Sequence, residues 1–149
     1  MKQKWVYFLC VFGLGLFLDQ ITKHWALKVL RGRSIPLWRG ILELRLRENV
    51  GSAFGLVLLG RSGILVITVG LSIAFIVWMI KNREISLPFL LGSSFFLAGA
   101  WGNLLDRFRW GYVVDFIEPS FWATFNLGDV LILGGVFLLA YRLLLHGKT

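Results

Sequence analysis

The chain has 149 residues, of which 57% are hydrophobic and 15% aromatic, and its mean hydropathy is +0.74. Soluble domains are about 45–50% apolar, so this composition argues against a soluble domain and predicts an integral membrane protein. The net charge of +8 would also suit a nucleic-acid-binding protein. We expect no nucleic-acid partner, because the basic residues surround the apolar segments and are bordered by tryptophans, as in proteins that contact lipid headgroups.

Four apolar segments approach the roughly 20 residues that a helix needs to cross a bilayer. They cover residues 5–27, 62–80, 86–105 and 126–145. The first follows Lys2 and Lys4, as in a secretory signal peptide, but it continues into polar residues from Asp19 to Lys23 instead of the small residues of a cleavage site. We therefore expect a retained membrane span and a single membrane domain over residues 1–149, with external loops at 28–61 and 106–125.

An even number of spans places both termini on the same side of the membrane. With the termini in the cytoplasm, six basic residues would lie inside and nine outside, which contradicts a simple positive-inside count. Lys2 and Lys4 beside the first span favour the cytoplasm for the termini. The charge pattern alone leaves the orientation open.

The first long loop contains an extended segment. Residues 42–47 alternate apolar and charged side chains, which indicates a strand with one apolar face. Pro36 lies before this strand and Gly51 after it, and residues 112–117 form a second β-prone segment. Because lipid leaves the backbone of an isolated strand unpaired, we expect the two segments to pair in a small sheet at the membrane surface.

Ionisable and amide side chains gather at the predicted outer ends of the spans. An ionisable residue at bilayer depth is costly, so its presence there indicates a function. Asp19 and Lys23 are four residues apart and share one helix face, where an ion pair would lower the cost of both charges. The alternative is that Lys23 only extends its ammonium toward the interface. Asn49, before Gly51, adds an uncharged donor and acceptor.

The third and fourth spans add further polar residues. Asn103 and Asp106 share a face near the end of the third span, where Gly99, Ala100 and Gly102 favour close helix packing. At the start of the fourth span, Asn126 is a natural N-cap and Asp129 lies in the first turn. A purely structural interpretation of Asp129 is that the helix dipole attracts its carboxylate.

Paired carboxylates are the chemistry that this chain offers. His24 and His146 lie at opposite interfaces, so no histidine-based triad or metal centre uses both, and we expect neither metal nor cofactor. Two nearby carboxylates that share one proton can activate water as base and acid. Asp115 lies among apolar residues that favour its protonated form, whereas the helix start favours ionised Asp129. Arg107 and Arg109 beside Asp106 are expected to keep it ionised and structural. We therefore prefer Asp115 with Asp129 over Asp106 with Asp129.

Five ordered blocks of residues resemble the lipoprotein signal peptidases (signal peptidase II) over nearly the whole chain. The blocks are Asp19-Gln20-x-Thr22-Lys23, Asn49-x-Gly51-x-Ala53-Phe54, Gly99-Ala100-x-Gly102-Asn103-x-x-Asp106-Arg107, Val113-Val114-Asp115-Phe116 and Phe125-Asn126-x-x-Asp129. Gly128 departs from the family, which usually has alanine there, and the connection from Asp115 to Asp129 is short.

The resemblance implies an all-α membrane fold of four transmembrane helices with a small extracytoplasmic β-cradle. It implies a multi-pass aspartic endopeptidase of the bacterial inner membrane, with cytoplasmic termini and an extracytoplasmic site. The substrate would be a diacylglyceryl-modified prolipoprotein, cleaved just before the lipidated cysteine, and the enzyme would contact membrane lipids as a monomer. The implied catalytic pair is Asp115 and Asp129. The supporting residues would be Asp19, Lys23, Asn49, Gly51, Asn103, Asp106, Arg107 and Asn126.

Two other classes compete with a peptidase. A small transporter or proton-coupled channel could use Asp19, Lys23 and the later carboxylates as a relay, although transport sites usually lie near the bilayer midplane. A non-catalytic subunit could use its glycine-rich helices for assembly, but it would not need Asp115 and Asp129 in different electrostatic settings. Cleavage of a lipidated precursor, compared with ion or solute flux, would separate these classes.

Overall fold

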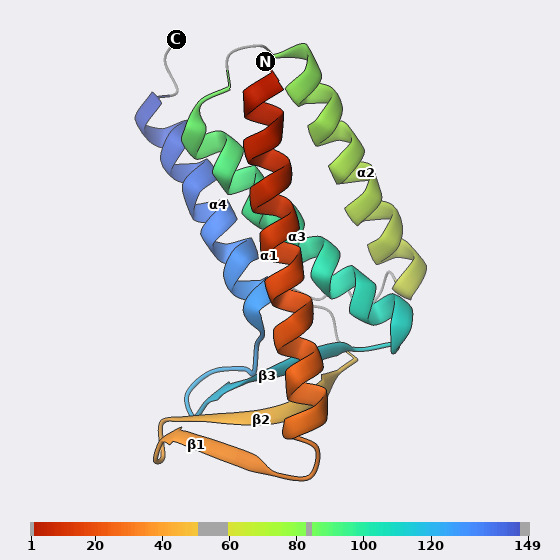
Figure 1. The fold of residues 1–149 in the computed structure, drawn as a ribbon, viewed down its shortest axis with the longest axis vertical. Coiled ribbons are helices and arrows are strands. Elements are labelled where there is room, and N and C mark those ends of the chain that lie inside the picture. Colours follow the sequence, from red (N-terminus) through yellow and green to blue (C-terminus); the bar gives the residue numbers. More distant parts are fainter. Residues whose placement is uncertain (1, 51–59, 83–84, 147–149) are drawn as a thin grey trace.

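The structure is a computed structural model that describes residues 2–50, 60–82 and 85–146. Within these ranges the elements are α1 (Lys2–Val29), β1 (Ser34–Trp38), β2 (Leu42–Asn49), α2 (Gly60–Lys81), α3 (Leu87–Arg109), β3 (Val113–Pro119) and α4 (Leu127–His146). All four helices are long and apolar enough to cross a membrane. The predicted fold class, four transmembrane helices with a small sheet, is confirmed (Figure 1).

The helices overlap the four predicted segments, and their ends differ by one to four residues. The largest difference is at the end of α3, which continues through Asp106 to Arg109. Hydropathy falls at these charged residues, but the helical hydrogen bonds continue. The N–H of Trp110 donates to the carbonyl oxygen of Asp106 at 2.8 Å, and the N–H of Gly111 donates to that of Arg107 at 3.1 Å. The charged end of α3 is therefore as ordered as its apolar part.

Helix α3 is the central helix, and it contacts α1, α2 and α4 (Figure 1). Glycines let the backbones of α3 and α4 touch. A Cβ atom at Gly99 would lie 2.1 Å from the carbonyl oxygen of Gly128, and one at Gly135 would lie 2.5 Å from that of Gly92. Neither position has room for a side chain. The expected close packing at Gly99 is confirmed. Small residues commonly allow such close contact between membrane helices.

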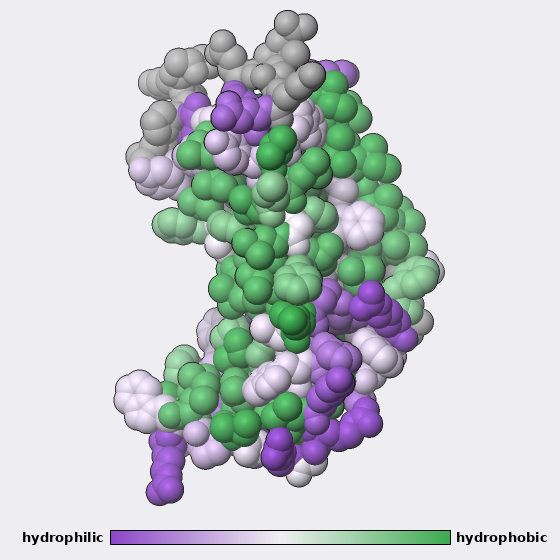
Figure 2. All heavy atoms as spheres, in the orientation of Figure 1, coloured by the Kyte–Doolittle hydropathy of each residue, from purple (hydrophilic) through white to green (hydrophobic). Residues whose placement is uncertain are grey.

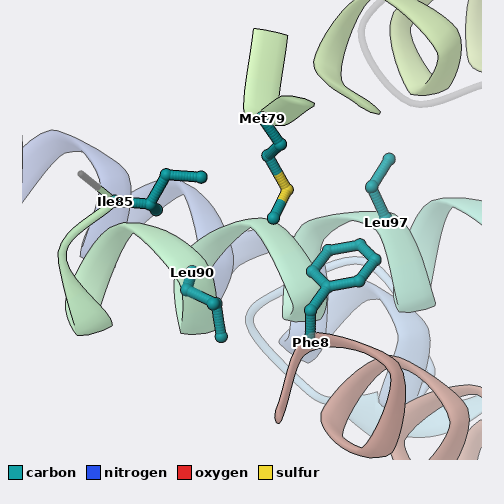
Figure 3. Packing of buried hydrophobic residues seen from close by; sticks show 5 residues of the cluster. All are labelled: Phe8, Met79, Ile85, Leu90 and Leu97. Atoms are coloured by element: carbon teal, nitrogen blue, oxygen red, sulfur yellow. The ribbon is translucent and has the colours of Figure 1, made fainter. Parts of the chain in front are cut away.

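The end of the bundle near the chain termini has an apolar core. Five buried side chains from α1, α2, α3 and the segment before α3 form what we call the apolar cluster: Phe8, Met79, Ile85, Leu90 and Leu97 (Figure 3). The ring of Phe8 also stacks with Phe12 and Phe75, with centroid distances of 6.1 and 6.2 Å. This cluster joins α2 to the rest of the bundle.

The three strands form an antiparallel sheet in the order β1-β2-β3, at the opposite end of the bundle from the apolar cluster (Figure 1). The expected pairing of residues 42–47 with residues 112–117 is confirmed, with Leu44 opposite Ile117 and Arg47 opposite Asp115. Strand β1 was not expected from the sequence. Ala26 of α1 and Leu30, just after this helix, pack against β3, which fixes the sheet, and with it Asp115, against the bundle.

The outer surface of the helices is apolar. Figure 2 shows hydrophobic residues over the helical part of this face, with hydrophilic residues concentrated toward its two ends. Large apolar side chains such as Leu14, Val66 and Phe137 are more than half exposed. An exposed apolar surface of this extent suits contact with lipid, since soluble monomers rarely expose one.

Candidate active site

A group of polar side chains, most of them buried, lies where α1, α3 and α4 meet the sheet. Members of what we call the polar network come from three helices and two strands: Asp19, Gln20 and Lys23 of α1, Asn49 of β2, Asn103 and Asp106 of α3, Asp115 of β3, and Asn126 and Asp129 at the start of α4. Burying charged groups is expensive unless they are paired and hydrogen-bonded. The contacts below provide that pairing.

Lys23 is the cation at the centre of the network, and its side chain is only 2% exposed. Its Nζ lies 2.9 Å from Asp19 Oδ2, 2.9 Å from Asp106 Oδ2 and 2.8 Å from Asn103 Oδ1. These three partners match the three N–H donors of an ammonium group. The expected Asp19–Lys23 ion pair is confirmed, and the alternative that Lys23 only extends to the interface is wrong.

Asp106 has a different setting from the one expected. Its sequence neighbours Arg107 and Arg109 were expected to hold it ionised, but its ion pair is with Lys23 of α1. The guanidinium of Arg109 donates to Gln20 Oε1 at 2.9 Å, and that of Arg107 donates to the Asn103 carbonyl oxygen at 3.3 Å. Arg107 also interacts electrostatically with the carboxylates of the network. Arg107 is adjacent to Asp106 and therefore points to another side of the helix. Arg109, three residues on, shares a face with Asp106 but binds Gln20.

Asp19 joins α1 to the beginning of α4. Its Oδ1 accepts a hydrogen bond from the backbone N–H of Gly128 at 2.7 Å. A Cβ atom at Gly102 would lie 2.1 Å from Asp19 Oδ2, so glycine at this position makes room for the carboxylate. Gly128 itself does not disturb the helix, which begins at the preceding residue.

The start of α4 has reciprocal hydrogen bonds. The N–H of Asp129 donates to Asn126 Oδ1 at 3.0 Å, and the N–H of Asn126 donates to Asp129 Oδ2 at 3.1 Å. This is the arrangement of a capping box, so the N-cap expected at Asn126 is confirmed. The capping also fixes the position of the Asp129 carboxylate, whose other oxygen, Oδ1, accepts from Asn103 Nδ2 at 2.8 Å.

Asp115 is buried in β3, with 2% of its surface exposed. Desolvation raises its pKa from 3.8 to about 6. The hydrogen bond from Asn49 Nδ2, at 2.8 Å, opposes this change, the negative charge of Asp129 adds to it, and the bond from Asn126 Nδ2, at 2.6 Å, opposes it again. Asp115 therefore changes protonation state closer to neutral pH than an ordinary aspartate does.

Two asparagines bridge Asp115 and Asp129. The Nδ2 of Asn126 donates to both Asp115 Oδ1 and Asn103 Oδ1, the latter at 3.1 Å, and Asn103 Nδ2 donates to Asp129. The structure therefore brings the two preferred carboxylates into one hydrogen-bonded chain. Asp106, the alternative partner of Asp129, is instead bound to Lys23, to Gln20 Nε2 and to the backbone N–H of Val114.

Gln20 is a member of the network that was not among the candidate site residues. Its Nε2 lies within 3.1–3.3 Å of Asp106 Oδ1, the Gly102 carbonyl oxygen and Asp19 Oδ2. Its place beside Asp19 in the first polar block was the available signal. Gly51, another candidate, lies outside the described residues. Within the described ranges, no three His, Cys, Asp or Glu side chains are arranged to hold a metal ion.

The fold and the site together define a multi-pass membrane protein in which Asp115 and Asp129 are linked through two asparagines, a grouping that suits an aspartic peptidase. The family model described as signal peptidase (SPase) II matches residues 11–145. The chain belongs to this family of aspartic peptidases, which remove signal peptides from prolipoproteins. This membership favours an enzyme over a transporter or a non-catalytic subunit.

Curated relatives of the chain are described as lipoprotein signal peptidases. The chain is 40% identical over 141 residues to a lipoprotein signal peptidase of Clostridium novyi, covering 90% of this chain and 95% of the relative. It is 42% identical over 134 residues to a lipoprotein signal peptidase of Caldanaerobacter subterraneus, covering 89% and 92%.

Solved structures support the fold. One is described as a bacterial membrane enzyme structure obtained by the in meso method at 2.3 Å resolution. It has a TM-score of 0.85 and 27% identity to this chain, with 96% of this chain and 92% of that one covered. A second, of the same description at 1.9 Å, has a TM-score of 0.83 and 29% identity, with 94% of each chain covered.

Proposed function

We propose that this peptidase cleaves diacylglyceryl-modified prolipoproteins just before the lipidated cysteine, with Asp115 and Asp129 as the catalytic pair. The observation that carries the proposal is the chain of hydrogen bonds from Asp115 through Asn126 and Asn103 to Asp129. It holds two carboxylates in different surroundings on separate elements. Different surroundings allow one carboxylate to act as the acid and the other as the base.

Asp129 takes the role of general base. Its carboxylate accepts hydrogen bonds from the Asn126 N–H and from Asn103 Nδ2, which hold it in place in the first turn of α4. It is also less buried than Asp115. In the reaction, Asp129 accepts a proton from a water molecule as the water oxygen attacks the scissile carbonyl carbon.

Asp115 takes the role of general acid. Its raised pKa, caused by burial, keeps a proton available closer to neutral pH. When the carbon–nitrogen bond breaks, Asp115 donates this proton to the leaving amine. Asp129 then holds the proton from water, and exchange of that proton back to Asp115 restores the starting state.

The remaining residues support this reaction. Asn103 and Asn126 orient the two carboxylates, and Asp19, Lys23 and Asp106 hold α1, α3 and α4 together around them. Arg107 adds a positive charge near both members of the pair. Asn49 and Gly51 begin the segment that, together with the sheet, would hold the peptide extended across the site.

We further propose that the sheet and the polar network face the extracytoplasmic side of a bacterial inner membrane, with both termini in the cytoplasm. The first residues of α1 and the last residues of α4 lie together at the far end of the bundle (Figure 1). A monomer in this orientation would receive the acyl chains of its substrate from the lipid and the peptide from the membrane surface. The proposal of a monomer is supported by the polar network, whose members all come from one chain.

The test is cleavage of a purified precursor by the full chain in liposomes. Matched precursors with and without the diacylglyceryl group on cysteine are compared, and the new N-terminus is identified by mass spectrometry. We expect cleavage of the lipidated precursor only, with the modified cysteine as the first residue of the product. Equal cleavage of both precursors, or a product that begins elsewhere, would contradict the proposal.

A further inference from the structure

The contacts of Asn103 with Lys23 and Asp129 determine which way its carboxamide faces. An ammonium group has donors and no acceptor, so the Asn103 atom 2.8 Å from Lys23 Nζ is the carboxamide oxygen. The nitrogen of Asn103 must then be the atom that faces Asp129. Lys23 therefore selects the face of the amide that the carboxylate meets.

The other contacts of Asn103 do not replace this function. Asn126 Nδ2 also donates to Asn103 Oδ1, at the longer distance of 3.1 Å, while its bond to Asp115 Oδ1 is 2.6 Å. If the Asn103 amide turned over, its oxygen would face the Asp129 carboxylate, and two acceptors would meet without a proton between them. Among the described residues, Lys23 makes the charge-assisted bond to that oxygen, and such bonds are roughly twice as strong as neutral ones.

Lys23 is itself held in place. Asp19 and Asp106 contact its ammonium at 2.9 Å each, from α1 and α3, and both carboxylates make further hydrogen bonds. With 2% of its side chain exposed, the lysine is buried among these partners. The ammonium is therefore a fixed donor.

We propose that Lys23 is a positioning residue for the peptidase reaction, because its ammonium fixes the Asn103 carboxamide with the N–H donors toward Asp129. The proposal rests on the proposed function, since it requires Asp129 to act in catalysis. It assigns Lys23 a role beyond holding the helices together. That role is exerted through one atom, Asn103 Oδ1.

The experiment compares two double variants of the full chain in liposomes, Lys23→Gln/Asp106→Asn and Lys23→Met/Asp106→Asn. Both lose one positive and one negative charge, so the network keeps its net charge, and glutamine and methionine have similar sizes. Only glutamine offers an N–H donor to Asn103, although from a side chain one bond shorter than lysine. We expect the methionine variant to have a kcat about tenfold lower than the glutamine variant, with KM within about twofold, because misplaced catalytic groups lower the chemical step.

The same comparison in an Asn103→Ala background identifies the route of the effect. We expect the difference between glutamine and methionine to fall within about twofold there, because the residue through which Lys23 acts is gone. A tenfold difference that persists without Asn103, or equal kcat values with Asn103 present, would overturn the proposal. A purely structural role would change the melting temperature and the yield of both double variants equally.

Two further measurements keep the outcomes distinct. If the double variants do not insert, NMR of the unaltered chain with ¹⁵N-labelled asparagine tests the same point: slowly exchanging Asn103 side-chain amide protons support a fixed carboxamide, and rapid rotation overturns it.

Asp129→Asn serves as the control for the proposed function. Retained activity in Asp129→Asn would reject the catalytic pair, whereas an inactive Asp129→Asn with equal glutamine and methionine variants would reject only the role of Lys23.

Discussion

The two ends of the helical bundle are stabilised in different ways, although α1 and α3 contribute to both. Near the termini, Phe8 and Leu90 pack in the apolar cluster, whose contacts depend on volume and have no direction. At the other end, Asp19 and Asn103 of the same two helices belong to the polar network, in which each contact has a donor and an acceptor. A substitution at the apolar end should change stability, and one at the polar end should change chemistry.

The largest expected effect is at the catalytic pair. Asp115→Asn or Asp129→Asn is expected to lower kcat by about 10³-fold or more, because general acid–base catalysis supplies about 10²–10⁴-fold and each variant removes one partner. The measurement is single-turnover cleavage of lipidated precursor in liposomes.

The matched control lies on the same helix as Asn103, at the apolar end. Ser93 is buried, and its Oγ donates to the Phe89 carbonyl oxygen at 2.7 Å. We expect Ser93→Ala to retain kcat within about twofold, since such a bond within the helix contributes about 1 kcal/mol. Equal losses at Ser93 and Asp129 would remove the distinction between the two ends.

The next effect concerns stability at the apolar end. Phe8→Ala removes a buried ring that contacts Phe12 and Phe75, and phenylalanine-to-alanine changes in cores cost about 3–5 kcal/mol. We expect a melting temperature several degrees lower in detergent, with kcat of the folded fraction nearly unchanged. Leu14→Ala, at a lipid-facing position that is 60% exposed, is the control and should change the melting temperature much less.

A smaller effect follows from the pKa of Asp115. This pKa is 3.8 for an ordinary aspartate and about 6 in the folded protein, so the folded state binds more protons than the unfolded state between these values. The free energy of unfolding should therefore fall as pH rises from about 4 to about 6, by up to about 3 kcal/mol. Melting curves of the unaltered protein and of Asp115→Asn across this range provide the measurement. Asp115→Asn should lack this fall in the free energy of unfolding. If stability depends on pH in the same way in both proteins, Asp115 does not titrate in the expected range.

The smallest effect is a shift in a pH profile. Asn49 Nδ2 donates to Asp115 Oδ2, which favours the ionised carboxylate, so Asn49→Ala should raise the pKa of Asp115 further. The alkaline limb of the kcat/KM profile should move to higher pH by up to about one unit, which corresponds to about 1.4 kcal/mol. Asn82→Ala, which removes a hydrogen bond to the Trp78 carbonyl oxygen at the far end of α2, should leave the limb in place. A shift to lower pH in Asn49→Ala would contradict this account of Asp115.

Local patterns predicted much of this molecule. Hydropathy located the four helices, and alternation located β2, because each signal reflects the surroundings of a single element. The capping of α4 by Asn126 was also predictable, since both partners lie within one turn. By contrast, β1 (Ser34–Trp38) has no alternation and contains Pro36, and it becomes a strand only by pairing with β2.

The connections within the site were less predictable. Asp106 was assigned to its neighbouring arginines, whereas its partner Lys23 lies on another helix. Gln20 likewise contacts Asp106 and Gly102 across the α1–α3 boundary. These partners depend on which helix faces touch, and a hydropathy pattern does not contain that information. The residue types of the site could therefore be inferred from the sequence. Which side chains pair, and which atom donates and which accepts in each hydrogen bond, could not.

The direct backbone contact between α3 and α4 also restricts how a lipid-modified substrate would approach. A side chain at Gly99 or at Gly135 would collide with the backbone of the facing helix, so two acyl chains would have to separate α3 and α4 to pass between them. The backbone of α2, in contrast, approaches only that of α3 among the described elements. Lateral diffusion of substrate from the bilayer should therefore end on the flank beside α2, and a cross-link between α3 and α4 should leave turnover intact.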